Sequence, residues 1–482
     1  MFLKAGALAL ALLLASRLLG LVRESVQAAA FGASGLADIV VLMLTLPDWL
    51  AGLVASGALA YVLLPAWAHE DAGRIAATQR RVGRILLVTG GVLGLLLVLL
   101  HGPAVEWLAG GLPAQLRPQA GVALFWSAVA LPLALLAALG VTRLQHERDL
   151  IGMYGANLVV NVLLIAALGA AAFAAPGPAL AWVGAGLLLA MLARLLWLLH
   201  RQRPFRRAPG LADTDTLPPA ALWWWAAAAA GLPLALPFVA RSLASQDGPG
   251  ALAVFNYAWK LVELPLVLAL QLVGTLALGP ISQALRSADG DRAATDTLRR
   301  GFALAWTLAC AAVAGLLLAS PAVAQLLFGW GRMQPEALEQ VARWGRIGSW
   351  SLLPQALVTI AVAVLAARER MRVAVIAYGV ALLVLLIAPA RDGAALMVWL
   401  DVLWVAIALA VLRALGPALK SWLPWRALAA PGVLLLMLQA LVSVAGVPAS
   451  HALQWLAAAA AAAAMVGAGW LASGDLRSAL RR

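Results

Sequence analysis

The chain has 482 residues, of which 64% are hydrophobic and 11% are charged, and its formal net charge is +13. Soluble domains carry about 25% charged and 45–50% apolar residues, so this composition excludes a soluble protein and predicts an all-α polytopic membrane protein. The basic residues lie between hydrophobic stretches, which is typical of cytoplasmic loops and argues against a nucleic-acid partner. The single cysteine, Cys310, excludes an intramolecular disulfide.

Fourteen hydrophobic stretches are long enough to cross a bilayer, which takes about 20 apolar residues. In chain order they cover residues 3–30, 36–67, 83–102, 120–141, 151–173, 177–199, 219–240, 249–284, 302–327, 338–366, 372–389, 393–413, 427–447 and 452–473. Several are longer than one straight crossing and contain Pro or Gly, so we expect kinked or tilted helices there.

The first two stretches contain charges that a lipid-facing helix would avoid. Arg17 and Asp38 lie at least one turn inside, whereas Arg23 and Glu24 lie near enough to an end to reach the interface instead. A charge near the bilayer centre costs at least about 2.5 kcal/mol, so such residues usually face a wet cavity or a charged partner. We therefore expect a polar cavity here, with a permanent Arg17–Asp38 pair as the alternative.

The eighth stretch repeats features of the second. The interval from Asp38 to Pro47 equals the interval from Asn256 to Pro265, and in both a Gly/Ala-rich segment follows. Such an echo indicates an internal repeat, as transporters often contain, although chance similarity between apolar helices remains the alternative. Lys260 lies inside this eighth stretch and is the basic counterpart of the charges in the first.

The echo predicts two lobes of six helices each, with two helices appended. The boundaries that we expect are residues 1–200 for the N-lobe, 201–218 for a cytoplasmic linker, 219–420 for the C-lobe, and 421–482 for the last two helices and a cytoplasmic tail. Most of the 34 lysines and arginines fall on one side of this arrangement. By the positive-inside rule, both termini are cytoplasmic. The opposite side holds only Arg117, Arg241, Arg332 and Arg391.

Motifs for other chemistry are absent from the sequence. It contains no GxxxxGK[ST] nucleotide-binding motif, and its five histidines show no metal-ligand spacing. No serine–histidine–aspartate set or carboxylate pair indicates hydrolysis. We therefore expect a transporter rather than an enzyme, with no cofactor and no bound metal. The driving ion, the oligomeric state and the exact cargo stay open.

Four segments resemble the MviN/MurJ family of lipid II flippases, in the multidrug/oligosaccharidyl-lipid/polysaccharide exporter superfamily: SRLLGLVRE, AAFGASGLAD, LPDWLAGLVASGALAYVLLP and NYAWKLVELP. The resemblance is sharp over residues 16–66, fair over 250–285, and elsewhere rests on the number of hydrophobic stretches. It implies fourteen helices, the last two forming a groove for a lipid tail. The residues that match the family pattern in the first two stretches are Ser16, Arg17, Gly20, Arg23, Glu24, Phe31, Gly32, Asp38, Leu46, Pro47, Gly57 and Pro65.

The sequence also departs from the family pattern. Ala51 and Gly52 stand where the family usually has one or two arginines, and Ser56 stands where it has a glutamate. The usual Asp-Arg pair of the eighth helix is Trp259-Lys260 here. The chain is therefore a divergent member on this reading, and another polyprenyl-linked cargo stays open.

The resemblance implies a flippase for a polyprenyl-pyrophosphate-linked sugar, such as the lipid II of peptidoglycan and cell-wall biosynthesis. The lipid would move from the inner to the outer leaflet of the bacterial inner membrane by alternating access. Its partners would be that lipid, membrane lipids and proteins of cell-envelope synthesis. The alternatives are a flippase for another lipid-linked oligosaccharide, a drug/cation antiporter of the same superfamily, and a non-transporting membrane scaffold.

The candidate site follows from what the phosphates of such a lipid require. Arginine offers them a bidentate fork and lysine a point charge, and nearby acids can hold these cations while the cavity is empty. Glu263 follows Lys260 by one helical turn, close enough to pair with it. The residues expected to bind phosphate are Arg17, Arg23 and Lys260, their charge partners are Asp38, Glu24 and Glu263, and the gating positions are Gly20, Pro47 and Pro265.

Overall fold

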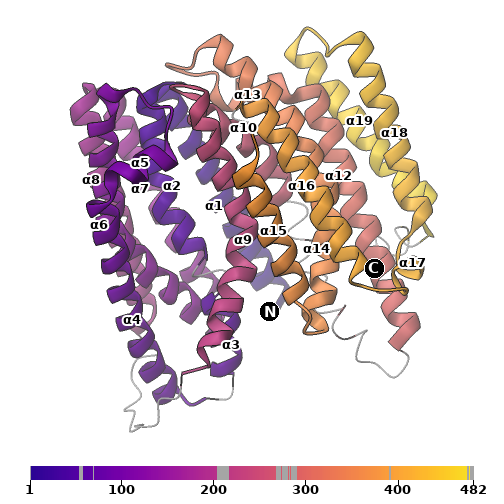
Figure 1. Ribbon diagram of the computed structural model, residues 1–482. Helices are drawn as coiled ribbons and strands as arrows, with labels where there is room; N and C mark the ends of the chain where they lie inside the picture. The colour runs from indigo at the N-terminus through magenta and orange to yellow at the C-terminus, as the bar shows by residue number, and fades with distance from the viewer. Residues whose placement is uncertain are drawn as a thin grey trace. The chain divides into compact units, whose positions relative to one another are not determined.

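The computed structural model describes residues 2–53, 58–68, 70–203, 217–267, 290–389 and 392–474, with the single residues 273, 281, 283 and 477. Within these ranges every regular element is a helix (Figure 1). Eleven helical stretches are long and apolar enough to cross a membrane, by length and composition. The expected all-α polytopic fold is confirmed.

The chain forms two compact units, which are described separately. Unit 1 comprises Met1–Ala253 and Trp330–Gln334, and unit 2 comprises Val254–Gly329 and Pro335–Arg482. The helices of unit 1 are α1 (Phe2–Phe31), α2 (Gly35–Leu53), α3 (Ala60–Trp67), α4 (Ala72–Leu99), α5 (His101–Leu108), η2 (Ala114–Leu116), α6 (Arg117–His146), α7 (Leu150–Ala172), α8 (Pro176–Arg201), α9 (Ala220–Ala244) and η4 (Ser245–Asp247).

Small residues allow the helices of unit 1 to approach closely, as is usual in membrane proteins. Gly155 of α7 lies against the ring of Trp197 of α8, and a Cβ there would come within 2.9 Å of it. The Trp197 indole N–H donates to the Gly152 carbonyl at 2.9 Å, so this contact also satisfies a polar group. The residues at which α7 and α8 meet therefore serve close packing as well as hydrophobicity.

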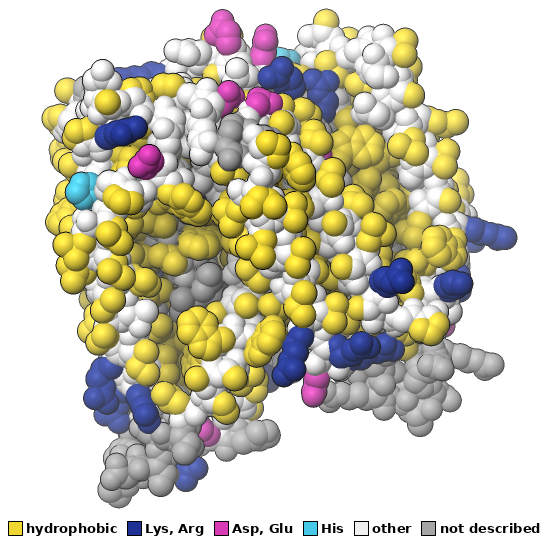
Figure 2. Space-filling view, in the orientation of Figure 1, with side chains coloured by type: hydrophobic (Ala, Val, Ile, Leu, Met, Phe, Trp, Pro, Cys, Tyr) yellow, Lys and Arg dark blue, Asp and Glu magenta, His cyan; other side chains and the backbone are white. Residues whose placement is uncertain are grey.

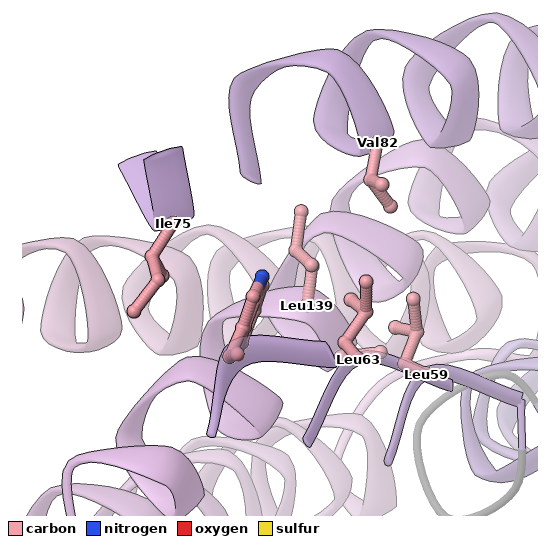
Figure 3. Packing of buried hydrophobic residues seen from close by; sticks show 7 residues of the cluster. Leu59, Leu63, Ile75, Val82 and Leu139 are labelled. Atoms are coloured by element: carbon pink, nitrogen blue, oxygen red, sulfur yellow. The ribbon is translucent and has the colours of Figure 1, made fainter. Parts of the chain in front are cut away.

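A cluster of buried side chains fixes α3 against α4 and α6 (Figure 3). Its members are Leu59, Leu63, Trp67, Ile75, Val82, Ala138 and Leu139. Figure 3 shows Leu59 and Leu63 beside Leu139, with Ile75 and Val82 on separate turns of α4. Each fully buried Leu or Ile contributes about 1.5–3 kcal/mol where water is the alternative environment, and within lipid the gain is close packing instead.

Unit 2 is also helical in the residues that the structure describes. Its helices are α10 (Ala251–Pro265), α12 (Gly290–Phe328), α13 (Pro335–Gly348), η6 (Ser349–Ser351), α14 (Leu352–Ala367), α15 (Arg372–Ile387), α16 (Gly393–Arg413), α17 (Leu419–Trp422), α18 (Trp425–Ala445) and α19 (His451–Ala472). The first three residues of α10 belong to unit 1. The last two long helices, α18 and α19, both pack against α12.

Polar contacts fix this packing. Pro321 interrupts the hydrogen bonding of α12, and the backbone N–H of the next residue, Ala322, donates to Gln454 Oε1 at 3.0 Å. The same Gln454 side chain, on α19, donates from Nε2 to the Pro448 carbonyl at 2.7 Å. The Trp306 indole of α12 donates to the Leu428 carbonyl of α18 at 2.9 Å. A side chain of α19 thus satisfies the backbone of α12 beside Pro321, and α18 adds a second polar contact at Trp306.

Each of the fourteen predicted stretches contains a helix, but several boundaries differ. Stretch 36–67 holds α2 and α3, and stretch 338–366 holds α13, η6 and α14. Stretch 83–102 covers the apolar part of α4, and the helix itself begins earlier, at Ala72, where Asp71 accepts a hydrogen bond from the Arg74 N–H at 2.8 Å. The ends of the lobes stay a prediction, and residues 204–216 of the linker lie outside the described residues.

Candidate functional site

Arg23 and Glu24 of α1 meet Asp48 of α2 in one charged cluster within unit 1. Arg23 of α1 pairs with the neighbouring Glu24, with 2.9 Å between Nη2 and Oε1. It also reaches Asp48 of α2, with 3.3 Å between Nη1 and Oδ2. The Arg23 Nε atom is enclosed and finds no hydrogen-bond partner among the described residues. Arg23 therefore connects α1 to α2 and keeps an unused donor.

Arg194 of α8 belongs to the same cluster. It lies within the predicted stretch 177–199, and α8 continues for about two further turns to Arg201. Arg194 interacts electrostatically with Asp48, and its Nε atom is likewise enclosed without a hydrogen-bond partner. Asp48 thus pairs with Arg23 and lies within electrostatic range of Arg194, which comes from a different helix.

Pro47 adjoins this cluster, and its effect on α2 is visible in the hydrogen bonds. Proline has no N–H, so the carbonyl four residues earlier, at Met43, loses its helical donor. The Ser127 hydroxyl of α6, fully buried, donates to that carbonyl at 2.8 Å. α2 therefore continues through Pro47 to Leu53. Pro265, its counterpart in the sequence echo, is the last residue of α10.

Arg17 and Gly20 lie nearer the start of α1. Arg17 is exposed, and no ion pair or hydrogen bond of its side chain is found within the described part of the chain. It shares a helix face with Glu24, since residues seven apart lie two turns apart on one side. Gly20 faces Asn161 of α7, whose Nδ2 donates to the Ser16 carbonyl at 3.3 Å. A phosphate-binding site that includes both Arg17 and the Glu24 region would therefore lie along this face of α1.

The expectation that Asp38 holds a cation is not met. Its buried carboxylate instead accepts hydrogen bonds from the backbone N–H groups of Gly250, at 2.6 Å, and Ala253, at 2.8 Å. These amides lie at the start of α10, where unpaired N–H groups and the helix dipole favour a negative charge. Asp38 is therefore a helix cap, and the alternative of an Arg17–Asp38 pair is also wrong.

Lys260 and Glu263 pair within unit 2, as their spacing predicts. The Lys260 Nζ atom lies 2.7 Å from Glu263 Oε2, and the two side chains remain about a quarter to a third exposed. The pair leaves Lys260 positioned on α10 with its charge locally balanced. The role of the pair in binding stays a prediction.

Asp149, in the short connection RLQHERDL, has a structural role. Its carboxylate receives two hydrogen bonds from Arg201, at 2.8 and 2.7 Å, and one from the Gly152 N–H at 2.9 Å. Partial burial opposes the charge of this carboxylate, but the Arg201 and Gly152 hydrogen bonds and the Arg201 charge outweigh it and lower the pKa of Asp149. The group is ionised and fully bonded, which fits a connector and not an acid–base catalyst.

Comparison with known proteins decides the family. A sequence model described as "Lipid II flippase MurJ" matches residues 27–472 of the chain. The chain belongs to the MurJ family. A curated lipid II flippase MurJ from Burkholderia cenocepacia is 30% identical over 355 residues, which cover 68% of this chain and 66% of that protein, so the match spans slightly less than two thirds of the relative.

Solved structures of the MurJ family and its superfamily share the fold. A lipid II flippase MurJ in an inward closed conformation has a TM-score of 0.77 at 14% identity, covering 99% of this chain and all of that one. An inward-facing multidrug resistance MATE transporter has a TM-score of 0.62 at 15% identity, covering 88% of this chain and 96% of that one. At such identities these likenesses show the fold alone, here a MurJ-type membrane bundle.

Proposed function

We propose that the protein is a lipid II flippase: it moves a polyprenyl-pyrophosphate-linked sugar from the inner to the outer leaflet of the bacterial inner membrane by alternating access. Membership of the MurJ family supports a transporter of this class. The observation that carries the proposal is the charged cluster of α1, α2 and α8, in which Arg23 pairs with Asp48 and Arg194 interacts electrostatically with the same carboxylate.

The cluster has the chemistry that a pyrophosphate requires. Two arginines with enclosed, unused Nε donors can each offer a fork of N–H groups to phosphate oxygens. In the empty protein, Glu24 and Asp48 neutralise the arginines. An entering pyrophosphate can replace these acids as the partner of the arginines, so that the charge is compensated with and without substrate. Arg17, exposed on the face of Glu24, can receive the headgroup first.

The distribution of charge supports the orientation that we propose, with both termini in the cytoplasm. Figure 2 shows a face covered mainly by hydrophobic side chains, with Lys and Arg mostly towards the margins of the view. Basic residues are concentrated in the connections on the side of both termini. That side is the cytoplasmic one under the positive-inside rule.

The test is mass spectrometry of the purified protein with titrated undecaprenyl-pyrophosphate sugars, on the parent and on Arg23→Gln. We expect the parent to retain these lipids, and Arg23→Gln to bind about tenfold more weakly or worse, because a hydrogen bond to a charged group contributes about 1.5–3 kcal/mol. Arg80→Gln, an exposed change on α4, is the matched control and should bind as the parent does.

The drug/cation antiporter is the second candidate, because MATE transporters share the fold. It predicts bound organic cations and no pyrophosphate lipid in the same experiment. That outcome, or equal binding by Arg23→Gln and the parent, would contradict the proposed function. A scaffold without transport would retain neither class of ligand.

A further inference from the structure

Unit 2 contains a carboxylate in the middle of a predicted membrane span that the proposed substrate site does not use. Asp401 lies near the centre of α16, the helix Gly393–Arg413. Its Oδ1 atom is enclosed and has no hydrogen-bond partner in the part of the chain that the structure describes. The backbone of Ser351 lies near enough to interact with the carboxyl group as a hydrogen-bond donor.

Ser351 lies at a break between two helices. α13 ends at Gly348, the 3₁₀ turn η6 covers Ser349–Ser351, and α14 begins at Leu352. The Ser351 hydroxyl donates to the Gly348 carbonyl at 2.7 Å and accepts from Gln355 Nε2 at 3.0 Å. The Ser351 hydroxyl is therefore bonded to groups of the break itself, and Ser351 interacts with Asp401 through its backbone. Interrupted helices of this kind line ion and proton sites in transporters.

Among the described residues, no charged side chain is found to compensate Asp401. The elements that pack against α16 are α13, η6, α14 and α15. Their titratable residues are Glu336, Glu339, Arg343, Arg346, Arg372 and Tyr378. None of these contributes a charge interaction to Asp401. One turn further along α16, Trp404 stacks edge-on against Tyr378, with 5.8 Å between ring centroids, and closes this side with aromatic rings.

An ionised carboxylate without a cationic partner is costly at this depth in a membrane. A bound proton removes the charge. Among the described residues, no group of three or more His, Cys, Asp or Glu side chains could hold a metal ion, so a metal here would depend on backbone, hydroxyl or amide oxygens. A proton needs no such set of ligands.

We propose that Asp401 is a proton-binding site that couples the flippase to the proton gradient. In one state of the transport cycle the carboxyl group holds a proton, and in the other, when the break at Ser349–Ser351 rearranges, it releases that proton to the opposite side. One proton is bound and one is released per cycle, and only the O–H bond forms and breaks. This inference rests on the proposed function.

The experiment measures flipping of undecaprenyl-pyrophosphate sugars by the full chain in proteoliposomes, with and without an imposed pH gradient, beside lipid binding by mass spectrometry. We expect the parent to flip several-fold faster with the gradient. Asp401→Asn, which cannot titrate, should bind the lipid normally and lose the response to pH. Asp392→Asn is the control, because asparagine can still accept the hydrogen bond from the Ala395 N–H that caps α16.

Several results would overturn the proton site. The first is a flipping rate of Asp401→Asn that rises with the pH gradient as much as the parent's does. The second is a parent whose flipping rate does not change with the pH gradient. The third is a parent that flips faster with a sodium gradient and loses this response in Asp401→Asn. If Asp401→Asn fails to fold, Asp401→Glu decides, since it keeps a titratable group and should retain the response with a shifted pH dependence. A parent that binds no pyrophosphate lipid would refute the proposed function, which the binding measurement reports separately.

Discussion

Arg194 supplies a positive charge to a site where this chain lacks the arginines of the family pattern. The family usually places arginines on the second helix, where this chain has Ala51 and Gly52. Those positions follow Asp48 by about one turn, and Ala51 is buried. Arg194 of α8 interacts electrostatically with Asp48 instead. A substrate phosphate near Asp48 can therefore meet two arginines, although only Arg23 comes from the helices that carry the family motif.

We predict that Arg194→Gln binds undecaprenyl-pyrophosphate lipids about tenfold more weakly than the parent, because a hydrogen bond to a charged group contributes about 1.5–3 kcal/mol. Arg194→Lys should fall between the two, since lysine keeps the charge and loses the planar fork. A lipid titration followed by mass spectrometry checks both. Unchanged binding by Arg194→Gln would place the arginine outside the substrate site.

The sequence predicts some residues of the candidate site better than others, for physical reasons. The Lys260–Glu263 pair follows from helical spacing alone, since both partners lie on one helix. The role of Arg194 could not be assigned, because its interaction with Asp48 joins residues far apart in sequence. The contacts of Asp38 with Gly250 and Ala253 join residues far apart in sequence, which no local pattern records.

At the scale of elements, a distant segment completes the turn between α1 and α2. Within unit 1, the Arg332 N–H donates to the Ala29 carbonyl at 2.9 Å, and Arg332 Nη2 donates to the Ala172 carbonyl at 3.1 Å. Gly32 and Gly331 have φ of +64° and +62°, and a Cβ on either would collide with a backbone oxygen, that of Arg332 or of Ala29. Both glycines are thus required by conformation and by close approach.

We predict that Gly32→Ala lowers the unfolding temperature of the detergent-solubilised protein by several degrees more than Gly416→Ala does. Gly416 also has a positive φ, +80°, but open space around its Cβ position, so its substitution reports only the left-handed conformation, about 1–2 kcal/mol. The collision with the Arg332 carbonyl adds to this cost at Gly32. Equal shifts for the two variants would show that the close approach carries no stability.

Two connections support the internal repeat that the sequence suggests. After α6, the Asp149 N–H donates to Leu144 O and the Arg148 N–H to Gln145 O; after α14, the Arg370 N–H donates to Leu365 O and the Glu369 N–H to Ala366 O. Both are Schellman motifs with a non-glycine residue at positive φ, Arg148 at 58° and Glu369 at 57°. They fall between the fourth and fifth stretches of each predicted lobe, which favours two related lobes.

The helices themselves were predictable, whereas their ends were not. Apolar runs of about 20 residues mark the spans reliably because lipid excludes polar side chains. α4 and α12 extend beyond their runs into basic sequence, starting at Ala72 and Gly290. These extensions depend on caps and solvent-exposed faces, such as the Asp71 cap of α4, and hydrophobicity does not report them.

At the scale of the whole molecule, the direction of transport depends on which side of the membrane each connection faces. An even number of crossings returns the C-terminus to the side of the N-terminus, and the basic connections then fall on that side. Phe173, between α7 and α8, is 95% exposed, and the predicted topology puts it on the side poor in basic residues. Gly210 lies in the basic segment between the two predicted lobes, which the same reasoning places in the cytoplasm.

We predict that an impermeant maleimide labels Phe173→Cys in intact cells and labels Gly210→Cys only after the membrane is permeabilised. Both variants are made on a Cys310→Ala background, because Cys310 is the single native thiol and is buried in α12, where alanine removes it without adding a polar group. The two sites control for each other, since each must react on one side and stay protected on the other. Labelling of Gly210→Cys in intact cells would reverse the orientation and, with it, the leaflet from which the arginine cluster first receives its lipid.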